Sequence, residues 1–247
     1  MKISIMKKNI DSQNRPFGCG QYGGGVFLAA ASITGVLMRL QAFLGLRGDM
    51  AEIGVLEGVY LRQLYSFLNA NEVCYAVDPY FELSGLKEKV KSDFEVRYGL
   101  ENQVHFLYES SLDLSPEMLE REESPGIRFF SIDGNHTEEY VLNDLIIAQR
   151  VLVTGGIIAI DDYFDPYSPG VSVGMARFFI ENNANRLAIL ISGGNKVFLT
   201  TKADYFRYRL LIKKFTNIKN VRSCSDKEWF GHSVFFVENI LSDNLPL

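Results

Sequence analysis

The sequence predicts a doubly wound α/β fold, in which a mostly parallel sheet ends in an antiparallel edge. First, residues 50–55 have the pattern of an apolar strand, and a tight turn at Gly54 and Gly58 leads into a helical pattern. Second, another apolar segment ends on Asp78, 20 residues after Gly58. Third, strand and helix patterns continue to alternate up to a hairpin signal, Ser192-Gly-Gly-Asn195. Such alternation is typical of parallel sheets covered by helices on both faces.

The remaining elements follow from hydrophobic periodicity. Residues 26–46 predict one or two helices, so residues 1–48 are expected to form an N-terminal loop and helical extension, with the glycine-rich run 18–25 as a linker. Residues 49–247 are expected to form a single domain. Strands are expected at residues 50–55, 73–78, 103–108, 128–133, 157–162, 187–191, 196–200 and 233–238, and helices at residues 59–68, 86–98, 116–123, 138–153, 174–182 and 204–215.

Charge and composition exclude several classes of partner. A net charge of −5 over 247 residues argues against nucleic acid, because a phosphate backbone needs a basic face. The apolar segment 26–38 is too short to span a bilayer and the N-terminus lacks a signal-peptide pattern, so we expect no membrane partner. Three widely spaced cysteines form neither a disulfide framework nor a metal-ligand pair, and a cytoplasmic location is expected.

Polar side chains collect where the expected strands end, and ligands of open parallel sheets bind at that edge. Helix capping explains one or two acids there, but not two adjacent aspartates after the apolar run 157–160. Glycines would let a ligand approach the backbone, and Asp78 would accept hydrogen bonds from ribose hydroxyls, so a nucleotide-like ligand is expected. The strand ends carry residues 52–58, Asp78, Ser110 and Ser111, residues 133–136, and Asp161 with Asp162.

Asp133, Asp161 and Asp162 come from the fourth and fifth strands, which are expected to be neighbours. Three carboxylates that converge would raise one another's pKa values unless a cation neutralised them. Oxygen ligands suit Mg²⁺, Mn²⁺ or Ca²⁺ better than Zn²⁺. His136, three residues past Asp133, lies where a general base would meet a substrate held on that cation, although a histidine in a loop is often only a surface residue.

These residues resemble the class I S-adenosylmethionine-dependent methyltransferases. More narrowly, the chain is similar to the metal-dependent small-molecule and sugar O-methyltransferases of the macrocin and rhamnosyl type. The resemblance covers residues 51–200 and includes Glu52-Ile-Gly-Val-Leu-Glu-Gly58. Its most specific motifs are Ile132-Asp-Gly-Asn-His136 and Gly155-Gly-Ile-Ile-Ala-Ile-Asp-Asp162. It implies a seven-stranded Rossmann-like sheet, a methyltransferase domain at residues 49–247, and S-adenosylmethionine with Mg²⁺ (or Mn²⁺) as cofactors.

The resemblance also implies roles for particular residues. The cofactor would be bound by Glu52, Gly54, Gly58, Asp78, Ser111 and Asp133, with Gly54 at its methionine part, Asp78 at the ribose and Ser111 near the adenine. The metal would be bound by Asp133, Asp161 and Asp162, and the catalytic residues would be Asp133 and His136, the latter as base or substrate ligand. The chain departs from the family at one point: the loop lacks the common Gly-x-Gly pair and has Val55 and Leu56 between its glycines.

Two other functions remain open from the sequence. A nicotinamide-dependent oxidoreductase would also need a glycine turn and a ribose acid, but it requires Gly-x-Gly-x-x-Gly and has no use for adjacent aspartates. A non-catalytic protein on the same fold would bind the cofactor or a partner without turnover. If the protein is a methyltransferase, its acceptor is the hydroxyl of a small molecule, such as a sugar, a polyketide or a phenol. A homo-oligomer through residues 26–46 is also possible.

Overall fold

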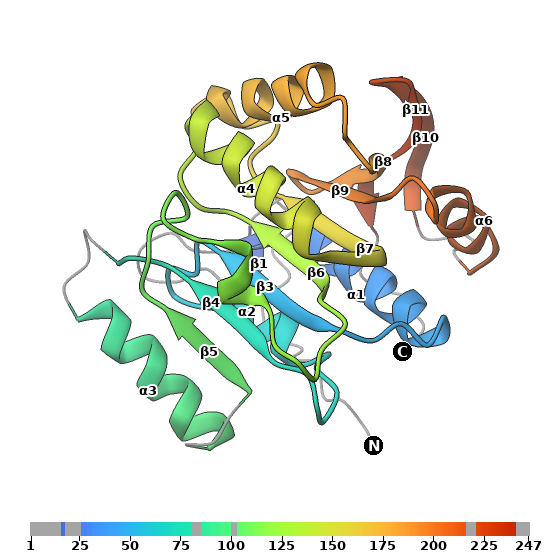
Figure 1. Ribbon diagram of the computed structural model, residues 1–247. Helices are drawn as coiled ribbons and strands as arrows, with labels where there is room; N and C mark the ends of the chain where they lie inside the picture. Colours follow the sequence, from blue (N-terminus) through green and yellow to red (C-terminus); the bar gives the residue numbers. More distant parts are fainter. Residues whose placement is uncertain (1–15, 18–25, 81–84, 100–102, 216–220, 241–247) are drawn as a thin grey trace.

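The computed structural model describes residues 16–17, 26–80, 85–99, 103–215 and 221–240 of the chain (Figure 1). Within these residues, a nine-stranded sheet carries helices on both faces, and β1 (Pro16–Phe17) pairs with β2 (Val26–Phe27) as a separate ribbon. The glycine-rich run 18–25 lies outside the described residues. The α/β fold with a mostly parallel sheet and an antiparallel edge is therefore confirmed.

Each strand and helix of the main sheet has defined bounds. The strands are β3 (Asp49–Ile53), β4 (Cys74–Val77), β5 (Val104–Leu107), β6 (Ile127–Ile132), β7 (Leu152–Ile160), β8 (Leu187–Gly193), β9 (Lys196–Thr201), β10 (Val221–Trp229) and β11 (His232–Ile240). The helices are α1 (Leu28–Phe43), α2 (Val59–Tyr65), α3 (Leu86–Tyr98), the short 3-10 helix η1 (Pro116–Leu119), α4 (Glu138–Val151), α5 (Pro169–Glu181) and α6 (Tyr205–Phe215).

The strand order places a topological switch point in the middle of the sheet. The order is β10-β11-β8-β9-β7-β6-β3-β4-β5, and the five strands from β7 to β5 are parallel to one another. The chain builds outward from β3 to β5 and then returns to add β6 and β7 on the other side of β3. Ligands of doubly wound sheets bind at the carboxyl ends of the strands where this reversal occurs, which here is between β3 and β6.

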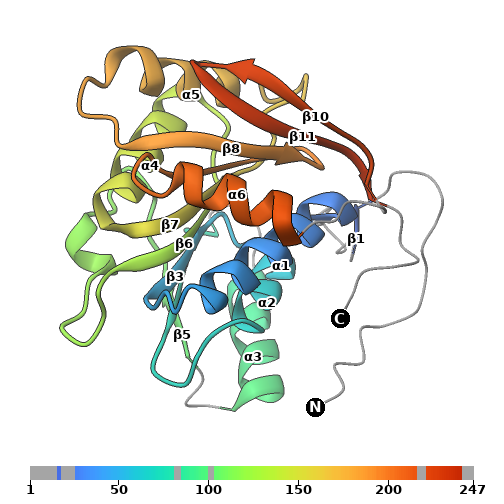
Figure 2. The same cartoon turned by 90° about the vertical axis from the view of Figure 1, so that its right-hand side faces the viewer.

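Two hydrophobic cores enclose the sheet, one on each face. Side chains of α1, α2, α3 and α6 pack on one face, and those of η1, α4 and α5 on the other. Figures 1 and 2 show α4 and α5 on the side of the sheet opposite α1 and α6. Strands buried on both faces explain the nearly continuous apolar runs in β6 and β7.

Several boundaries differ from the sequence-based expectations. The sheet has nine strands instead of seven, because the hairpin of β10 and β11 extends the edge beyond β8. No strand pattern marks β10, because Val221-Arg-Ser-Cys-Ser-Asp-Lys-Glu-Trp229 is largely polar, as an edge strand can be. The strand expected at residues 157–162 begins earlier, because β7 starts at Leu152 and includes Gly155 and Gly156, and only residues 116–119 of the expected helix 116–123 are helical.

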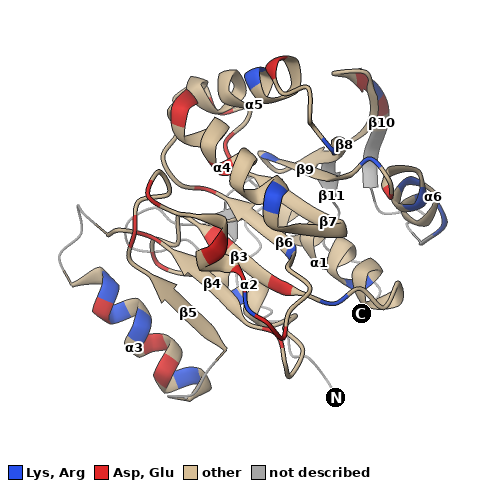
Figure 3. Ribbon diagram, viewed as in Figure 1, with Lys and Arg blue, Asp and Glu red and all other residues tan. Residues whose placement is uncertain are grey.

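Charged side chains lie mainly on the outer helices and loops. On α3, Lys and Arg alternate with Asp and Glu along the helix (Figure 3), and Lys91 and Glu95 form an i,i+4 ion pair at 3.9 Å. Among the described residues, none of the helices has the length and hydropathy needed to cross a bilayer.

Candidate active site

Four residues singled out from the sequence form a row just past the strand ends. Each backbone amide donates a hydrogen bond to the last carbonyl of the neighbouring strand: Gly54 to Val77, Asp78 to Leu107, Asp133 to Ile53 and Asp161 to Ile132, at 2.9–3.0 Å. The hydrogen-bond ladder of the sheet therefore continues for one residue beyond the strands. These hydrogen bonds fix the order Asp78, Gly54, Asp133, Asp161 across the carboxyl ends of the strands and place Gly54 beside Asp133 at the switch point.

Gly54 is required by a close backbone approach. Its φ of +83° lies in the left-handed region, and a Cβ atom on it would be 1.9 Å from the carbonyl oxygen of Asp133. The loop after β3 and the loop after β6 therefore touch through their backbones at this point. A glycine here leaves the surface next to Asp133 open to a ligand.

Asp78 holds the glycine loop in shape. Its Oδ2 atom accepts hydrogen bonds from the backbone N–H groups of Val55 and Leu56 at 3.0 and 2.9 Å, and its Oδ1 atom accepts one from Tyr80 at 2.8 Å. Leu56 and Tyr80 both have positive φ angles, of 46° and 52°, which cost energy for residues with side chains. Gly58 (φ +67°) closes the loop as the N-cap of α2, where a Cβ would come within 3.2 Å of Phe94.

A buried lysine lies between two of the predicted aspartates. The Nζ atom of Lys196 is 2.7 Å from Oδ2 of Asp161 and 3.4 Å from Oδ2 of Asp133, and the side chain is only 1 % exposed. Burial by itself would lower the pKa of Lys196, but the carboxylates of Asp133 and Asp161 outweigh it and raise that pKa above its ordinary value. The ammonium therefore remains charged. It neutralises part of the negative charge of Asp133, Asp161 and Asp162, which together form the acidic edge of the site.

Asp162 and His136 form a second pair beside the first. The Nε2 atom of His136 lies 3.2 Å from Oδ2 of Asp162, and its Nδ1 atom lies 2.9 Å from the hydroxyl oxygen of Ser168. Asn195 donates a hydrogen bond from Nδ2 to Oδ1 of Asp162 at 2.5 Å. Burial and the neighbouring Asp161 raise the pKa of Asp162, and burial followed by Asp161 does the same for Asp133.

Glu52 lies beneath this edge, as the second-last residue of β3. Its side chain is fully buried, and Oε2 has no hydrogen-bond partner among the described residues. Burial raises the pKa of Glu52 well above its usual range, although Lys196 acts against this. Glu52 therefore sits below the loop that Gly54 opens, as a carboxyl group that keeps its proton more readily than an exposed glutamate.

Ser111 is buried at the end of the β5 loop, next to α4. Asn143 donates a hydrogen bond from Nδ2 to the backbone oxygen of Ser111 at 2.7 Å. Asp144, also on α4, is fully buried, and burial raises its pKa to about 7. Ser111 and Asn143 favour its charged form, but neither carboxyl oxygen makes a hydrogen bond of good geometry among the described residues, so burial dominates.

Replacement of Asp144 by Asn is expected to change how stability depends on pH. The pKa of Asp144 is higher in the folded protein than in the unfolded chain, so ionisation of this carboxyl group lowers the free energy of unfolding. This loss is absent below the unfolded pKa near 4 and grows until the pH reaches about 7. The gain in unfolding free energy from Asp144→Asn should therefore be larger at pH 8 than at pH 5, by roughly 2–3 kcal/mol.

Urea unfolding at the two pH values measures this difference. The exposed Asp93 on α3 supplies the control, and Asp93→Asn should follow the wild type. An Asp144→Asn effect that is the same at pH 5 and pH 8 would show that this carboxyl group titrates normally.

The acidic edge fits a divalent cation. Asp133, His136 and Asp162 each offer one ligand atom, and these atoms all lie within 4.8 Å of one another. The third aspartate expected from the sequence, Asp161, is at the same edge but is held by Lys196. Its Oδ1 atom also accepts the backbone N–H of Asp162 at 3.0 Å. Two carboxylates beside an imidazole are a donor set that divalent cations accept.

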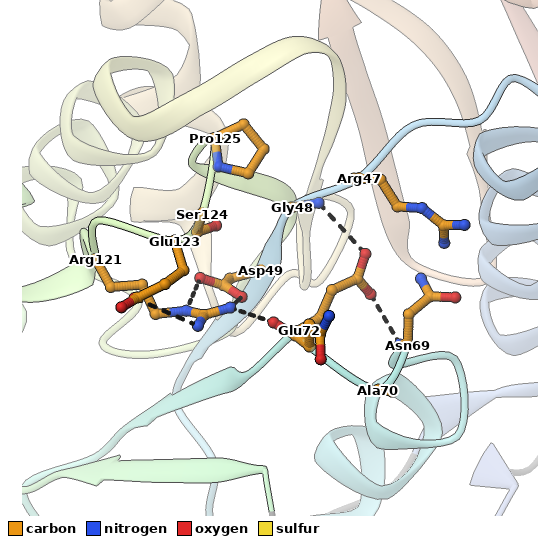
Figure 4. A pocket seen from close by; sticks show the side chains of 11 residues that line it. Arg47, Gly48, Asp49, Asn69, Ala70, Glu72, Arg121, Glu123, Ser124 and Pro125 are labelled. Carbon is orange, nitrogen blue, oxygen red and sulfur yellow. Dashed lines mark hydrogen bonds and ion pairs between the residues drawn. The ribbon is translucent and has the colours of Figure 1, made fainter.

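A cavity of about 470 Å³ lies at the opposite edge of the sheet (Figure 4). It surrounds the amino end of β3, where Arg121 pairs with Asp49 at 2.7 Å and Glu72 accepts backbone N–H groups from Gly48 and Asn69. Behind it, Glu72 also pairs with the buried Arg128 at 2.8 Å. These interactions tie loops together far from the carboxyl ends of the strands, so the cavity is separate from the candidate site.

Sequence analysis missed three residues of the site. Lys196 and Asn195 lie at the β8–β9 turn, for which the sequence predicts only a hairpin, and Ser168 precedes α5. The one available signal was the turn sequence Ser192-Gly-Gly-Asn-Lys196, in which a lysine directly precedes the apolar run 197–199. Its distance of 63 residues from Asp133 hid the contact.

Comparison with known proteins agrees with this geometry. Residues 51–163 match a family model described as a methyltransferase domain. Among curated proteins, no match was found.

Solved structures share the fold at low sequence identity. CalS11, described as TDP-rhamnose 3′-O-methyltransferase of calicheamicin biosynthesis, is 18 % identical, with 69 % of this chain and 77 % of that chain covered and a TM-score of 0.56. The O-methyltransferase NovP is 15 % identical, with 70 % and 80 % covered and a TM-score of 0.54. TomG from Streptomyces achromogenes, an O-methyltransferase involved in tomaymycin synthesis and solved with S-adenosylmethionine, is 18 % identical, with 68 % and 78 % covered and a TM-score of 0.51.

The matched domain spans both the glycine loop and the Asp161–Asp162 pair, and the fold around it is that of the structures just described. Residues 51–163 therefore match a methyltransferase domain, and the chain has a fold that solved O-methyltransferases share.

Proposed function

We propose that the protein transfers the methyl group of S-adenosylmethionine to a hydroxyl oxygen of a small molecule. The observation that carries this proposal is the placement of His136 and Asp162 next to Asp133, one strand away from the glycine loop at the switch point. A cofactor site and a proton acceptor are then neighbours. The O-methyltransferases that share the fold support the same reaction class.

The cofactor would lie across the ends of β3, β4 and β6. Gly54 leaves room for its methionine part beside Asp133, and Asp78 has lone pairs on Oδ1 left for ribose hydroxyls after its backbone hydrogen bonds are made. Glu52 would line the cofactor site from below the glycine loop, and Gly58 would shape the end of that loop. Ser111 would lie near the adenine. S-adenosylmethionine supplies a methyl group on a sulfonium, so these residues need only bind and orient it for in-line attack.

Asp133 and Asp162 would hold Mg²⁺ or Mn²⁺, with Asp161 beside them. Mg²⁺ is commonly bound by one or two carboxylates, with substrate and water oxygens completing the shell. Bound there, a divalent cation would lower the pKa of the acceptor hydroxyl and orient its oxygen.

His136 would take the proton from the acceptor hydroxyl at Nε2. Ser168 holds the ring through Nδ1, and the carboxylate of Asp162 would stabilise the imidazolium that forms. Imidazole is a poorer ligand than carboxylate for a hard cation, which leaves His136 free for this role.

The acceptor would reach the site past the loop between β7 and α5. Phe164 and Tyr167 in this loop are 53 % and 92 % exposed, and Tyr163 packs against Trp229 with ring centroids 4.7 Å apart. Exposed aromatic side chains suit the ring of a sugar, a phenol or a polyketide. CalS11 is described as acting on TDP-rhamnose, which supports a sugar or another natural product as the acceptor.

The first test is a calorimetric titration of the full chain with S-adenosylhomocysteine, with NAD⁺ as the comparison. We expect micromolar binding of S-adenosylhomocysteine and none of NAD⁺, because the loop lacks the Gly-x-Gly-x-x-Gly pattern of a dinucleotide site. Asp78→Ala should weaken that binding at least tenfold, since it removes both the ribose acceptor and the anchor of the glycine loop. The exposed Glu109→Ala should bind as the wild type does.

Binding of NAD⁺ but not of S-adenosylhomocysteine would favour an oxidoreductase. If neither ligand binds, the assignment of S-adenosylmethionine as cofactor is wrong. Release of S-adenosylhomocysteine with candidate acceptors, measured with Mg²⁺ and with chelator, then tests catalysis. Cofactor binding without turnover on sugar, phenol and polyketide acceptors would favour a non-catalytic protein. Equal turnover with metal and with chelator would contradict the cation assignment.

A further inference from the structure

We infer that Lys196 sets the strength of the divalent-cation site, because it holds Asp161 away from a cation bound by Asp133 and Asp162. Lys196 is thus a positioning residue, which keeps the third carboxylate of the acidic edge out of the ligand set. The inference deepens the proposed function and rests on its cation site.

The surroundings of Lys196 keep its ammonium at one place. Lys196 is the first residue of β9, and the pairing of Val197 with Ile160 places it opposite the end of β7, where Asp161 follows. Its Nζ atom contacts Asp161 at 2.7 Å and lies 4.5 Å from the centre of the Tyr60 ring. The hydroxyl of Tyr60 is in turn hydrogen-bonded to Thr34 of α1 at 2.7 Å. A buried ammonium without these partners would be too costly to keep.

The adjacent residues Asn195 and Lys196 give the two adjacent aspartates, Asp162 and Asp161, different electrostatic partners. Lys196 is a cation and cancels the charge of Asp161, whose other oxygen is taken by the backbone N–H of Asp162. Asn195 is a neutral donor to Oδ1 of Asp162 and does not cancel the charge of that carboxylate as an ammonium would. Asp162 and Asn195 adopt positive φ angles of 56° and 68° to make this arrangement. A divalent cation is therefore attracted to Asp162 more strongly than to Asp161.

Removal of the ammonium should strengthen cation binding in two ways. It abolishes the repulsion between Lys196 and the cation, and it frees Asp161 to become a third carboxylate ligand. A residue with only a structural role would do the opposite, because its loss would disorder the ligands and weaken binding.

The test is titration of the full chain with Mn²⁺ alone, followed by calorimetry or by the paramagnetic signal of free Mn²⁺. Lys196→Met should bind Mn²⁺ at least tenfold more tightly than the wild type. The double variant Lys196→Met with Asp161→Asn should lose this gain, since the gain depends on Asp161. Asp162→Asn should weaken Mn²⁺ binding both in the wild type and in Lys196→Met. Lys196→Arg, which keeps the charge, should bind Mn²⁺ as the wild type does.

Equal or weaker Mn²⁺ binding by Lys196→Met would overturn the inference, and so would a gain that persists after Asp161→Asn. If Lys196→Met folds poorly, the increase in melting temperature on adding Mn²⁺ gives the same comparison, and it should exceed the increase of the wild type. Binding by Lys196→Met but not by the wild type supports the inference. Absence of binding in every variant overturns it together with the proposed cation, while binding of S-adenosylhomocysteine and turnover with chelator report separately on methyl transfer.

Discussion

Replacement of His136 by Gln is expected to lower kcat by about 10²–10⁴-fold while the affinity for S-adenosylhomocysteine stays unchanged. His136 lies between Ser168 and Asp162, at 2.9 and 3.2 Å, on the side of Asp133 away from the glycine loop. A glutamine amide can donate a hydrogen bond to Asp162, as the imidazolium would after proton transfer, but it cannot accept a proton from an acceptor hydroxyl. The loss should therefore fall on the chemical step.

Two further variants define the size of this effect. Ser168→Ala removes only the group that orients the ring, so its loss in kcat should be smaller than that of His136→Gln. His105→Gln changes an exposed histidine on β5 and should leave kcat at the wild-type value. If His136→Gln turns over as fast as the wild type, the base is another group and His136 is only a neighbour of the site.

Gly54→Ala is expected to destabilise the protein by roughly 3–5 kcal/mol and to abolish binding of S-adenosylhomocysteine. An added Cβ would lie 1.9 Å from the carbonyl oxygen of Asp133 and 2.7 Å from the backbone nitrogen of Gly134. Both are backbone atoms at the end of β6, so they cannot move aside without breaking the hydrogen bond between Asp133 N–H and Ile53. Urea unfolding and calorimetric titration measure the two consequences.

Gly85 provides a matched control for this experiment. Its φ of +81° is nearly the same as that of Gly54, but no atom lies within 4 Å of the position a Cβ would take. Gly85→Ala should therefore cost only the penalty of a left-handed backbone, about 1–2 kcal/mol, and should keep the cofactor affinity. Equal losses for the two variants would mean that backbone conformation, and not the approach to Asp133, makes Gly54 necessary.

The sequence was a good guide to the parallel part of the sheet. Residues 73–78 and 128–133 were expected as strands and correspond to β4 and β6, because strands buried on both faces leave a mainly apolar run between turn signals. It was a poor guide to the edge. The polar β10 forms by pairing with β11, and a strand stabilised mainly by such pairing leaves little local pattern.

For the site, the sequence by itself determined which residues stand at the carboxyl edge. Glycines and acids that follow apolar strands must meet there in any parallel sheet, so Gly54, Asp78, Asp133, His136, Asp161 and Asp162 could be named from their positions alone. Only the tertiary structure decided how these groups are paired. Lys196 reaches Asp161 because β9 enters the sheet antiparallel to β7, with Val197 opposite Ile160. That register depends on long-range packing, and no local sequence pattern encodes which carboxylate receives the buried charge.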